Sequence, residues 1–180
     1  MMLIEAKYLP NYTYSQYCKW EGRWELIDGI PFSMLPNATP IHQRVNGNLH
    51  GNFKKALKKA CKKCKVYIPI DWKITEHTIV QPDLSVVCKP SEKKYLDFSP
   101  ILVAEILSPS TALKDRNVKR QIYQTQGVKY FLIINPQTKK IEVYELIKDE
   151  YSLVASTPKT FTFILEDGCK AKVDFTDIWE

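Results

Sequence analysis

The sequence of 180 residues lacks several features that mark other classes of protein. No run approaches the roughly 18 to 20 consecutive apolar residues that a membrane-spanning helix needs. The segment 1–8 lacks the basic start and the long apolar core of a secretion signal. No internal repeat, low-complexity tract or linker interrupts the chain. These absences predict a single domain over residues 1–180, in a cytoplasmic protein that does not enter a membrane.

Cysteine is scarce and odd in number, with five residues at positions 18, 61, 64, 88 and 169. An odd, scattered set indicates reduced thiols rather than a disulfide framework. Cys61 and Cys64 have the C-x-x-C spacing of zinc ligands, but the sequence offers no second pair and no nearby His-x-x-x-His to complete four ligands. A redox motif would open a helix after a strand, whereas this pair ends a predicted helix. We interpret the spacing as chance.

Basic residues outnumber acidic ones, 26 to 20, which gives a formal net charge of +6 and permits a polyanionic partner. From about Thr39 apolar residues recur every three or four positions, which predicts an amphipathic helix. Lysines recur on it at four-residue spacing, where they repel one another slightly. Contacts to a phosphate backbone would explain them, and a solvated helix face is the equal alternative. The two rows are Lys54, Lys58 and Lys62, and Lys55, Lys59 and Lys63.

Two short and almost wholly apolar segments, 80–88 and 101–109, each carry a single acid. Such segments are typical of strands in a sheet that is buried on both faces. Removing a carboxylate from water costs several kcal/mol unless a partner compensates it. Asp83 and Glu105 on what would be adjacent strands therefore suggest a divalent cation site. The alternative is that each acid forms a buried hydrogen-bonded pair.

The residues before the long helix predict a β-hairpin over 23–34, because Asp28-Gly29 suits the positive φ angles of a two-residue turn. Glu25 lies on the first arm of this hairpin. It is interpreted as a solvated strand acid, with a third carboxylate of the site as the alternative. His42 lies at the start of the long helix, where a capping or surface role is the default.

A second helix is predicted after Glu105, because residues 108–111 supply hydroxyl caps and a proline, and Gly127 supplies a stop. Asp115 precedes Lys119 by four residues, so a helix-face ion pair is one interpretation of Lys119. One face is predicted to lie against the sheet through Leu113, Val118 and Ile122, and its neighbour to carry Arg116, Lys119 and Tyr123.

The remaining apolar and alternating segments predict strands, so the fold class is α/β with a mixed sheet and helices against it. The segments 141–146 and 151–155 alternate in polarity, as antiparallel edge strands with one wet face do. The predicted strands are 66–70, 72–75, 128–134, 141–146, 151–155, and a last hairpin of 161–165 with 171–175.

Taken together, the sequence resembles the PD-(D/E)XK nuclease superfamily, and within it the bacterial Uma2 family of restriction-endonuclease-like proteins. Pro82-Asp83 alone is a common dipeptide. The segment from Glu105 to Thr111, followed by Lys119, Tyr123 and Gly127-Val, is a more specific match. The resemblance implies a restriction-endonuclease-like, three-layer α/β/α fold with a central mixed sheet and an N-terminal hairpin.

The resemblance also implies a metal-dependent phosphodiesterase. Asp83 and Glu105 would bind Mg²⁺ or Mn²⁺ through oxygen. The superfamily places a lysine two residues after the second acid, where this chain has Leu107, and Lys119 is the substitute. The implied supporting residues are Glu25, His42 and Tyr123. Apart from the resemblance, the predicted nucleic-acid contacts are Lys54, Lys55, Lys58, Lys59, Lys62 and Arg116.

Three functions remain open from the sequence. The first is a Mg²⁺-dependent endonuclease or nickase that acts on double-stranded DNA, for which a homodimer would be suited by analogy. The second is a nucleic-acid-binding or assembly module that has kept the fold without turnover. The third is a structural domain in which Asp83 and Glu105 form buried pairs with Lys119 and Arg116.

Overall fold

A six-stranded mixed sheet forms the centre of the fold in the computed structural model, which describes residues 9–34, 39–108 and 115–180. Only β7 and β8 are parallel, and every other neighbouring pair in this sheet is antiparallel. The strand order is β10 (Glu150–Ser156), β9 (Lys140–Ile147), β8 (Tyr130–Asn135), β7 (Leu102–Ile106), β6 (Leu84–Val87) and β3 (Lys65–Tyr67).

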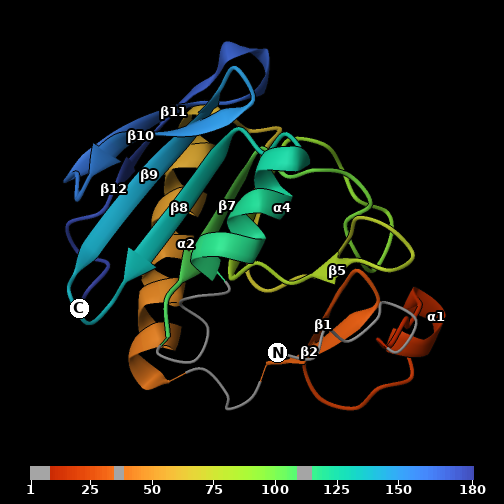
Figure 1. The fold of residues 1–180 in the computed structure, drawn as a ribbon. Helices are drawn as coiled ribbons and strands as arrows, with labels where there is room; N and C mark the ends of the chain where they lie inside the picture. Colours follow the sequence, from red (N-terminus) through yellow and green to blue (C-terminus); the bar gives the residue numbers. More distant parts are fainter. Residues whose placement is uncertain (1–8, 35–38, 109–114) are drawn as a thin grey trace.

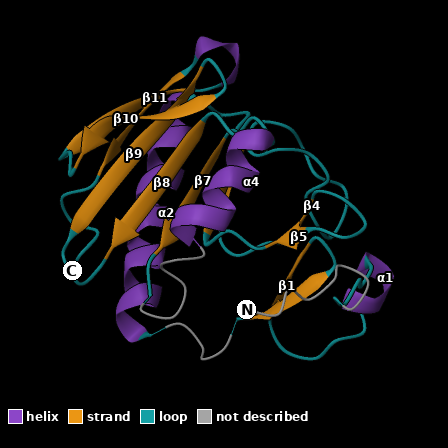
Figure 2. Cartoon of the chain, viewed as in Figure 1, coloured by secondary structure: helices purple, strands orange, loops and turns teal. Residues whose placement is uncertain are grey.

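Helices cover both faces of this sheet, so the chain has three layers (Figure 1). The long helix α2 (Pro40–Ala60) lies behind the sheet, and α4 (Arg120–Thr125) lies in front of it (Figure 2). The helix α2 begins where predicted, because the Thr39 side chain accepts a hydrogen bond from the His42 amide and Pro40 opens the first turn. The predicted three-layer α/β/α fold is confirmed.

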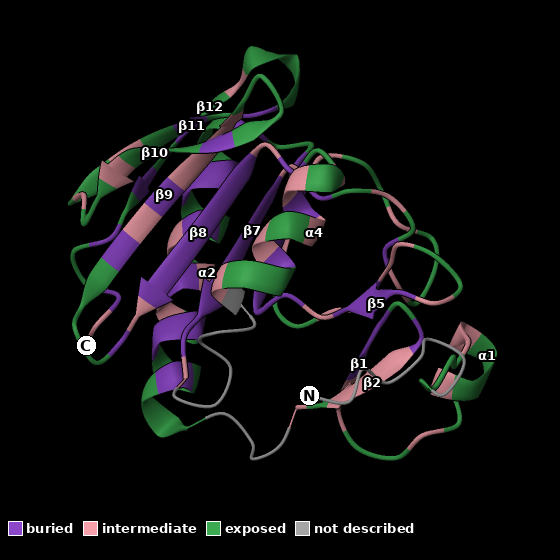
Figure 3. Ribbon diagram, in the orientation of Figure 1, coloured by how far each residue is buried: buried purple, intermediate pink, exposed green. Residues whose placement is uncertain are grey.

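Alternation along the strands divides the core into two halves. The central strands β7 and β8 are buried along nearly all of their length (Figure 3). Leu84, Val86 and Ala104 point toward α2 and the hairpin of β11 (Thr160–Ile164) and β12 (Lys170–Asp174). Val87 and Val103 point to the opposite face, toward α4. Buried apolar residues on both faces explain why these segments are nearly continuous apolar runs in the sequence.

The predicted N-terminal hairpin is confirmed as β1 (Trp24–Ile27) and β2 (Ile30–Ser33). Asp28 and Gly29 have positive φ angles of 50° and 77° in its turn. The hairpin continues into a small sheet of order β2-β1-β5-β4, with β5 (Ile79–Val80) and β4 (Trp72–Lys73), and the short helix α1 (Tyr14–Tyr17) lies beside it (Figure 1). This lobe brings β1 to the side of the sheet that α4 covers.

The helix α4 follows a π-helical turn (Asp115–Lys119), which the sequence did not predict. A π-turn takes more residues than an α-turn, so it changes the face that each later residue presents. Val118 is 40% exposed, which makes its predicted place against the sheet wrong, whereas Lys119 and Tyr123 are buried. The predicted helix start at residues 109–111, and Leu113, lie outside the described residues.

The prediction of reduced and unrelated cysteines is wrong in this structure. Disulfides join Cys61 to Cys169 and Cys64 to Cys88, and the exposed Cys18 is free. Cys88 and Cys169 are far from Cys61 and Cys64 in the sequence. The pairing of β6 with β3 brings Cys88 to the end of α2, and the C-terminal hairpin brings Cys169 there. Across the described ranges, no helix has the length and apolar character to span a membrane.

Candidate active site

The two acids singled out in the sequence lie at neighbouring strands, because Asp83 directly precedes β6 and Glu105 lies on β7. Leu84 of β6 is paired with Ala104 of β7 in an antiparallel register, so Asp83 stands opposite Glu105. Side chains opposite each other in such a ladder point to the same face of the sheet. Both acids are buried, with exposed fractions of 8% for Asp83 and 1% for Glu105. Folding therefore places two buried carboxylates at neighbouring positions of adjacent strands.

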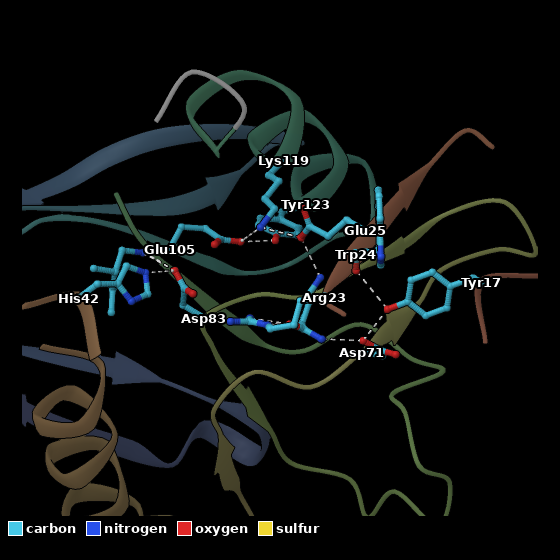
Figure 4. Close-up of polar contacts among 12 residues, drawn as sticks. Tyr17, Arg23, Trp24, Glu25, His42, Asp71, Asp83, Glu105, Lys119 and Tyr123 are labelled. Carbon is cyan, nitrogen blue, oxygen red and sulfur yellow. Dashed lines mark hydrogen bonds and ion pairs between the residues drawn. The ribbon is translucent and has the colours of Figure 1, made fainter. Parts of the chain in front are cut away.

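Lys119 joins two of the buried carboxylates (Figure 4). Its Nζ lies 2.8 Å from Glu25 Oε1 and 3.0 Å from Glu105 Oε1, and the side chain is 1% exposed. The Tyr123 hydroxyl donates a hydrogen bond to Glu105 from the next turn of the helix. Burial and the neighbouring Glu105 charge raise the pKa of Tyr123 well above its ordinary value, so the phenol stays protonated and acts as a donor.

Asp83 is held by a separate set of donors. The Ile106 amide donates to Asp83 Oδ2 over 2.8 Å, and His42 Nε2 lies 3.2 Å from the same oxygen. Burial alone would raise the pKa of Asp83, but the His42 hydrogen bond and the Lys119 charge outweigh it and lower that pKa. Burial also opposes the charged form of His42, and the bond to Asp83 raises its pKa nonetheless. Asp83 is therefore an ionised carboxylate at neutral pH.

Two residues take places that differ from the first interpretation of the sequence. Glu25 is 0% exposed rather than a solvated strand acid, because β1 presents this side chain to the buried Lys119. His42 is buried rather than a surface or capping side chain, since the first turn of α2 ends beside Asp83. The side chain of Asp115, the alternative partner of Lys119, lies outside the described residues.

Sequence reasoning missed three residues that hold the site in place. Asn46, one turn after His42 on α2, donates from Nδ2 to the Asp83 carbonyl over 3.0 Å. The Gln81 amide donates to Glu25 Oε1 over 2.9 Å, and Arg23 donates to the Gln81 side chain. The signal for Asn46 was a polar residue four positions after a histidine, beside an apolar stripe. We see no comparable signal for Gln81 and Arg23.

Arg116 lies away from the carboxylates. Its Nη1 donates to Glu142 Oε2 on β9 over 2.8 Å. Among the described residues, Arg116 therefore pairs with Glu142 rather than with Asp83 or Glu105, the partners that the structural-domain hypothesis predicts. Glu142 also accepts a hydrogen bond from the Tyr144 hydroxyl. A role of Arg116 in nucleic-acid contact stays a prediction.

The two lysine rows flank α2 on different sides. The first row borders the edge strand β3 and lines a hollow of about 550 Å³ with Lys65 and Tyr67. Lys55 and Lys59 of the second row line a hollow of about 550 Å³ on the side of β12. All three lysines of the first row, Lys54, Lys58 and Lys62, therefore line the hollow beside β3.

The donor chemistry of the site suits a hard divalent cation. Mg²⁺ is bound in proteins by one or two carboxylates together with waters and substrate phosphates, which Asp83 and Glu105 would match. Asn46 Oδ1, near Asp83, is a buried oxygen with no hydrogen-bond partner in the part of the chain that the structure describes. Within the same ranges no group of three or more His, Cys, Asp or Glu is arranged to hold a metal.

A mixed sheet between helices, with Asp83 and Glu105 at neighbouring strands and the buried Lys119 in the helical segment that follows β7, defines a restriction-endonuclease-like α/β protein. The sequence model of the Uma2 family, described as "Putative restriction endonuclease", matches residues 12–175. The chain therefore belongs to the Uma2 family, as the sequence resemblance predicted.

A relative and a solved structure agree with this assignment. An uncharacterized protein of Synechocystis sp. is 36% identical over 143 residues, which cover 75% of this chain and 74% of that protein. A crystal structure of a "putative nuclease" of DUF820 from Anabaena variabilis matches with a TM-score of 0.71 at 16% identity, over 93% of this chain and 97% of that one. At this identity the second match supports the fold alone.

Proposed function

We propose that this protein is a Mg²⁺-dependent endonuclease that hydrolyses phosphodiester bonds of DNA. The observation that carries the proposal is the convergence of three buried acids, Glu25, Asp83 and Glu105, with the buried Lys119. Burying so many charged groups costs several kcal/mol per ion. A fold stabilised by apolar packing alone has no need of them, whereas phosphodiester hydrolysis uses both carboxylates and an ammonium.

The carboxylates of Asp83 and Glu105 would hold the cation, with waters and a substrate phosphate completing its shell. A bound divalent cation lowers the pKa of a coordinated water and neutralises charge on the scissile phosphate. The ionised state of Asp83 suits this task, because a carboxylate must be deprotonated to act as a ligand.

Lys119 would orient the attacking water or stabilise the charge of the pentacovalent phosphorus. Its ammonium lies 3.0 Å from Glu105, which supports the proposal that Lys119 would take the role of the lysine that superfamily members carry two residues after the acid. Glu25 would set the direction of the Lys119 ammonium, since its carboxylate lies on the other side of Nζ at 2.8 Å. Tyr123 would orient Glu105 through its hydroxyl.

The lysine row beside β3 is a suitable contact for the duplex. At 1.5 Å per residue along α2, Lys54 and Lys58 lie about 18 and 24 Å from His42, which contacts Asp83. At 3.4 Å per base pair, those distances correspond to about five to seven base pairs of double-stranded DNA. The row would therefore hold the phosphate backbone on one side of the cleavage point.

A nucleic-acid-binding module without turnover is the second candidate. Leu107 occupies the position of the usual lysine, and Lys119 is engaged by two carboxylates rather than directed at an open surface. A protein that had lost catalysis could keep these buried pairs for stability. The lysine rows would then be its functional surface.

Incubating the protein with supercoiled plasmid in Mg²⁺, Mn²⁺ or EDTA separates the two candidates. The endonuclease proposal predicts nicked or linear product with either cation and intact plasmid in EDTA. Salt-sensitive DNA binding in EDTA, with no cleavage in either cation by the folded protein, would support the binding module instead.

A further inference from the structure

Four of the five cysteines meet at the C-terminal end of α2. Cys61 caps this helix, and the Cys64 amide closes the following turn by donating to the Cys61 carbonyl over 2.9 Å. Cys88 directly follows β6, and Cys169 directly follows the short 3₁₀ turn Glu166–Gly168. The Cα atoms of Cys64 and Cys88 are 3.8 Å apart, and those of Cys61 and Cys169 are 5.7 Å apart.

All four cysteines line one hollow of about 360 Å³. Cys61 and Cys64 are 3% and 4% exposed, and the other two pack partly buried against the same half of the core. In the disulfide-bonded form the sulfurs bind one another and are not metal ligands, in keeping with the absence of any metal-holding group in the described ranges. Once reduced, the same backbone positions would present four thiols to one hollow.

This convergence is unnecessary for two independent cross-links, which could lie anywhere in the fold. It is required of a structural zinc site of the four-cysteine type, in which four sulfur ligands surround the metal in tetrahedral geometry. Two of the ligands commonly come from one C-x-x-C turn, as Cys61 and Cys64 do here, and the other two from a distant part of the chain. Cys88 and Cys169 supply the second pair that is missing from the local sequence.

The charges around the hollow suit such a centre. Zn²⁺ with four thiolates carries a net charge of −2, and cationic neighbours favour the thiolate form. Lys59, Lys62 and Lys63 line the hollow. Glu166 and Asp167 line it too, and Lys63 lies 3.1 Å from Asp167 Oδ2. Three lysines against two acids leave a local positive charge that would partly offset the centre.

We propose that in the reduced protein Cys61, Cys64, Cys88 and Cys169 bind one Zn²⁺ as a structural site. Four S–H bonds break, four Zn–S bonds form and four protons pass to the solvent. Opening the disulfide form requires a dithiol reductant, which gives two electrons and two protons to each disulfide and is oxidised to its own disulfide. The metal would fasten the end of α2 to the end of β6 and to the turn between β11 and β12.

The test is to purify the protein under dithiothreitol with no chelator and to measure zinc by mass spectrometry. The proposal predicts about one zinc ion per chain. It also predicts that replacing zinc with Co²⁺ gives the sulfur-to-cobalt charge-transfer band and the visible bands of a tetrahedral centre. Cys88→Ser and Cys169→Ser should each lose most of the metal, whereas Cys18→Ser, at the exposed cysteine, should keep it.

Circular dichroism establishes that each sample is folded, and the wild-type zinc content needs no variant. Folded, reduced wild type with negligible zinc and no tetrahedral cobalt spectrum would overturn the proposal and leave two simple disulfides. Zinc that persists in Cys88→Ser and Cys169→Ser would overturn it as well. The readout is independent of DNA cleavage, so it does not depend on the nuclease proposal.

Discussion

At the scale of the residue, Lys119 is the buried cation that pairs with two of the three buried acids of the site. Its ammonium is shared between Glu25 and Glu105 in a place that water scarcely reaches. Removing one member of a buried charge set is far more costly than removing an exposed pair, because the remaining charges stay in a poorly solvating environment. The same burial fixes the direction of the ammonium, which a catalytic role would require.

Lys119→Met is expected to lower the free energy of unfolding by about 3–5 kcal/mol at neutral pH, since two buried carboxylates lose a shared cation. Urea denaturation would measure the loss, with Lys94→Met as the control at an exposed lysine. A loss below about 1 kcal/mol, as at a surface pair, would contradict the buried arrangement.

The Arg116–Glu142 pair predicts a pH dependence. Burial raises the pKa of Glu142, but the hydrogen bonds from Arg116 and Tyr144 outweigh burial and lower it below its ordinary 4.5. A lowered carboxyl pKa contributes stability above the unfolded value, and this contribution is lost as the pH falls through the folded value.

Glu142→Gln should therefore cost about 0.5–1 kcal/mol at pH 7, a small value because the pair is partly exposed. The difference from wild type should shrink as the pH falls below 4.5. Thermal unfolding of both proteins across this range is the measurement. A stability difference between the two proteins that stays constant with pH would show that lost packing, rather than the lost charge, destabilises Glu142→Gln.

The sequence was informative for the residues whose burial is costly. Asp83 and Glu105 could be predicted because a lone acid in an apolar strand needs a partner. The sequence favours solvent exposure for Glu25 and a capping or surface role for His42, because the pattern within one hairpin or one helix start does not tell which layer will cover it. The choice of Lys119 came from the family resemblance rather than from helical periodicity.

At the scale of the element, the β1–β2 hairpin delivers Glu25 to the site and depends on its turn. Gly29 has a φ of 77°, and a Cβ there would lie 2.8 Å from the Cα of Asn11. Both the backbone angle and the lack of space disfavour any side chain. The hairpin itself was predictable, because Asp28-Gly29 is a dipeptide that suits a tight two-residue turn.

Gly29→Ala should destabilise the protein by about 1–3 kcal/mol and lower any activity that requires Glu25 in place. Gly51→Ala is the matched control in α2, where nothing lies within 4 Å of the added carbon. It should stabilise by about 0.5–1 kcal/mol. Chemical denaturation of both variants tests the pair, and equal effects of the two would refute the role assigned to the turn.

The π-helical turn before α4 is the element that the sequence could not reveal. Ordinary helical spacing places Val118 inward, whereas the structure buries Lys119 and Tyr123. Periodicity assumes one pitch throughout, and a single wider turn breaks that assumption. Such turns are frequent at functional sites, and this one brings Lys119 to the carboxylates.

At the scale of the whole molecule, the fold brings together segments that the sequence separates. Strand order places β3 beside β6 and the C-terminal hairpin beside α2, which unites the four cysteines. Local patterns predict strands and helices, but the order of strands in a sheet depends on contacts across the whole chain. The family resemblance supplied the three-layer fold, and the cysteine site had no counterpart in that resemblance.

The lysine row beside β3 predicts how DNA binding responds to salt. In the triple variant of Lys54, Lys58 and Lys62 to Gln, the slope of log affinity against log salt should fall by about one for each lysine that contacts a phosphate. Fluorescence anisotropy in EDTA would measure it. A control with equal charge loss replaces the exposed residues Lys89, Lys94 and Lys148. An equal decrease of the slope in the two triple variants would indicate that the net charge of the protein, rather than a defined contact surface, determines DNA binding.

The most direct test of the account is cleavage of supercoiled plasmid in Mn²⁺ by four proteins prepared identically: wild type, Asp83→Asn, Glu105→Gln, and Asp97→Asn as a control at an exposed acid paired with Lys93. The account predicts cleavage by wild type and by Asp97→Asn, and a loss of at least about a hundredfold in the other two. Residual cleavage of equal rate in all four would mark a contaminating nuclease. No cleavage by any of them, with each folded and bound to DNA, would contradict the assignment of a catalytic centre to Asp83 and Glu105.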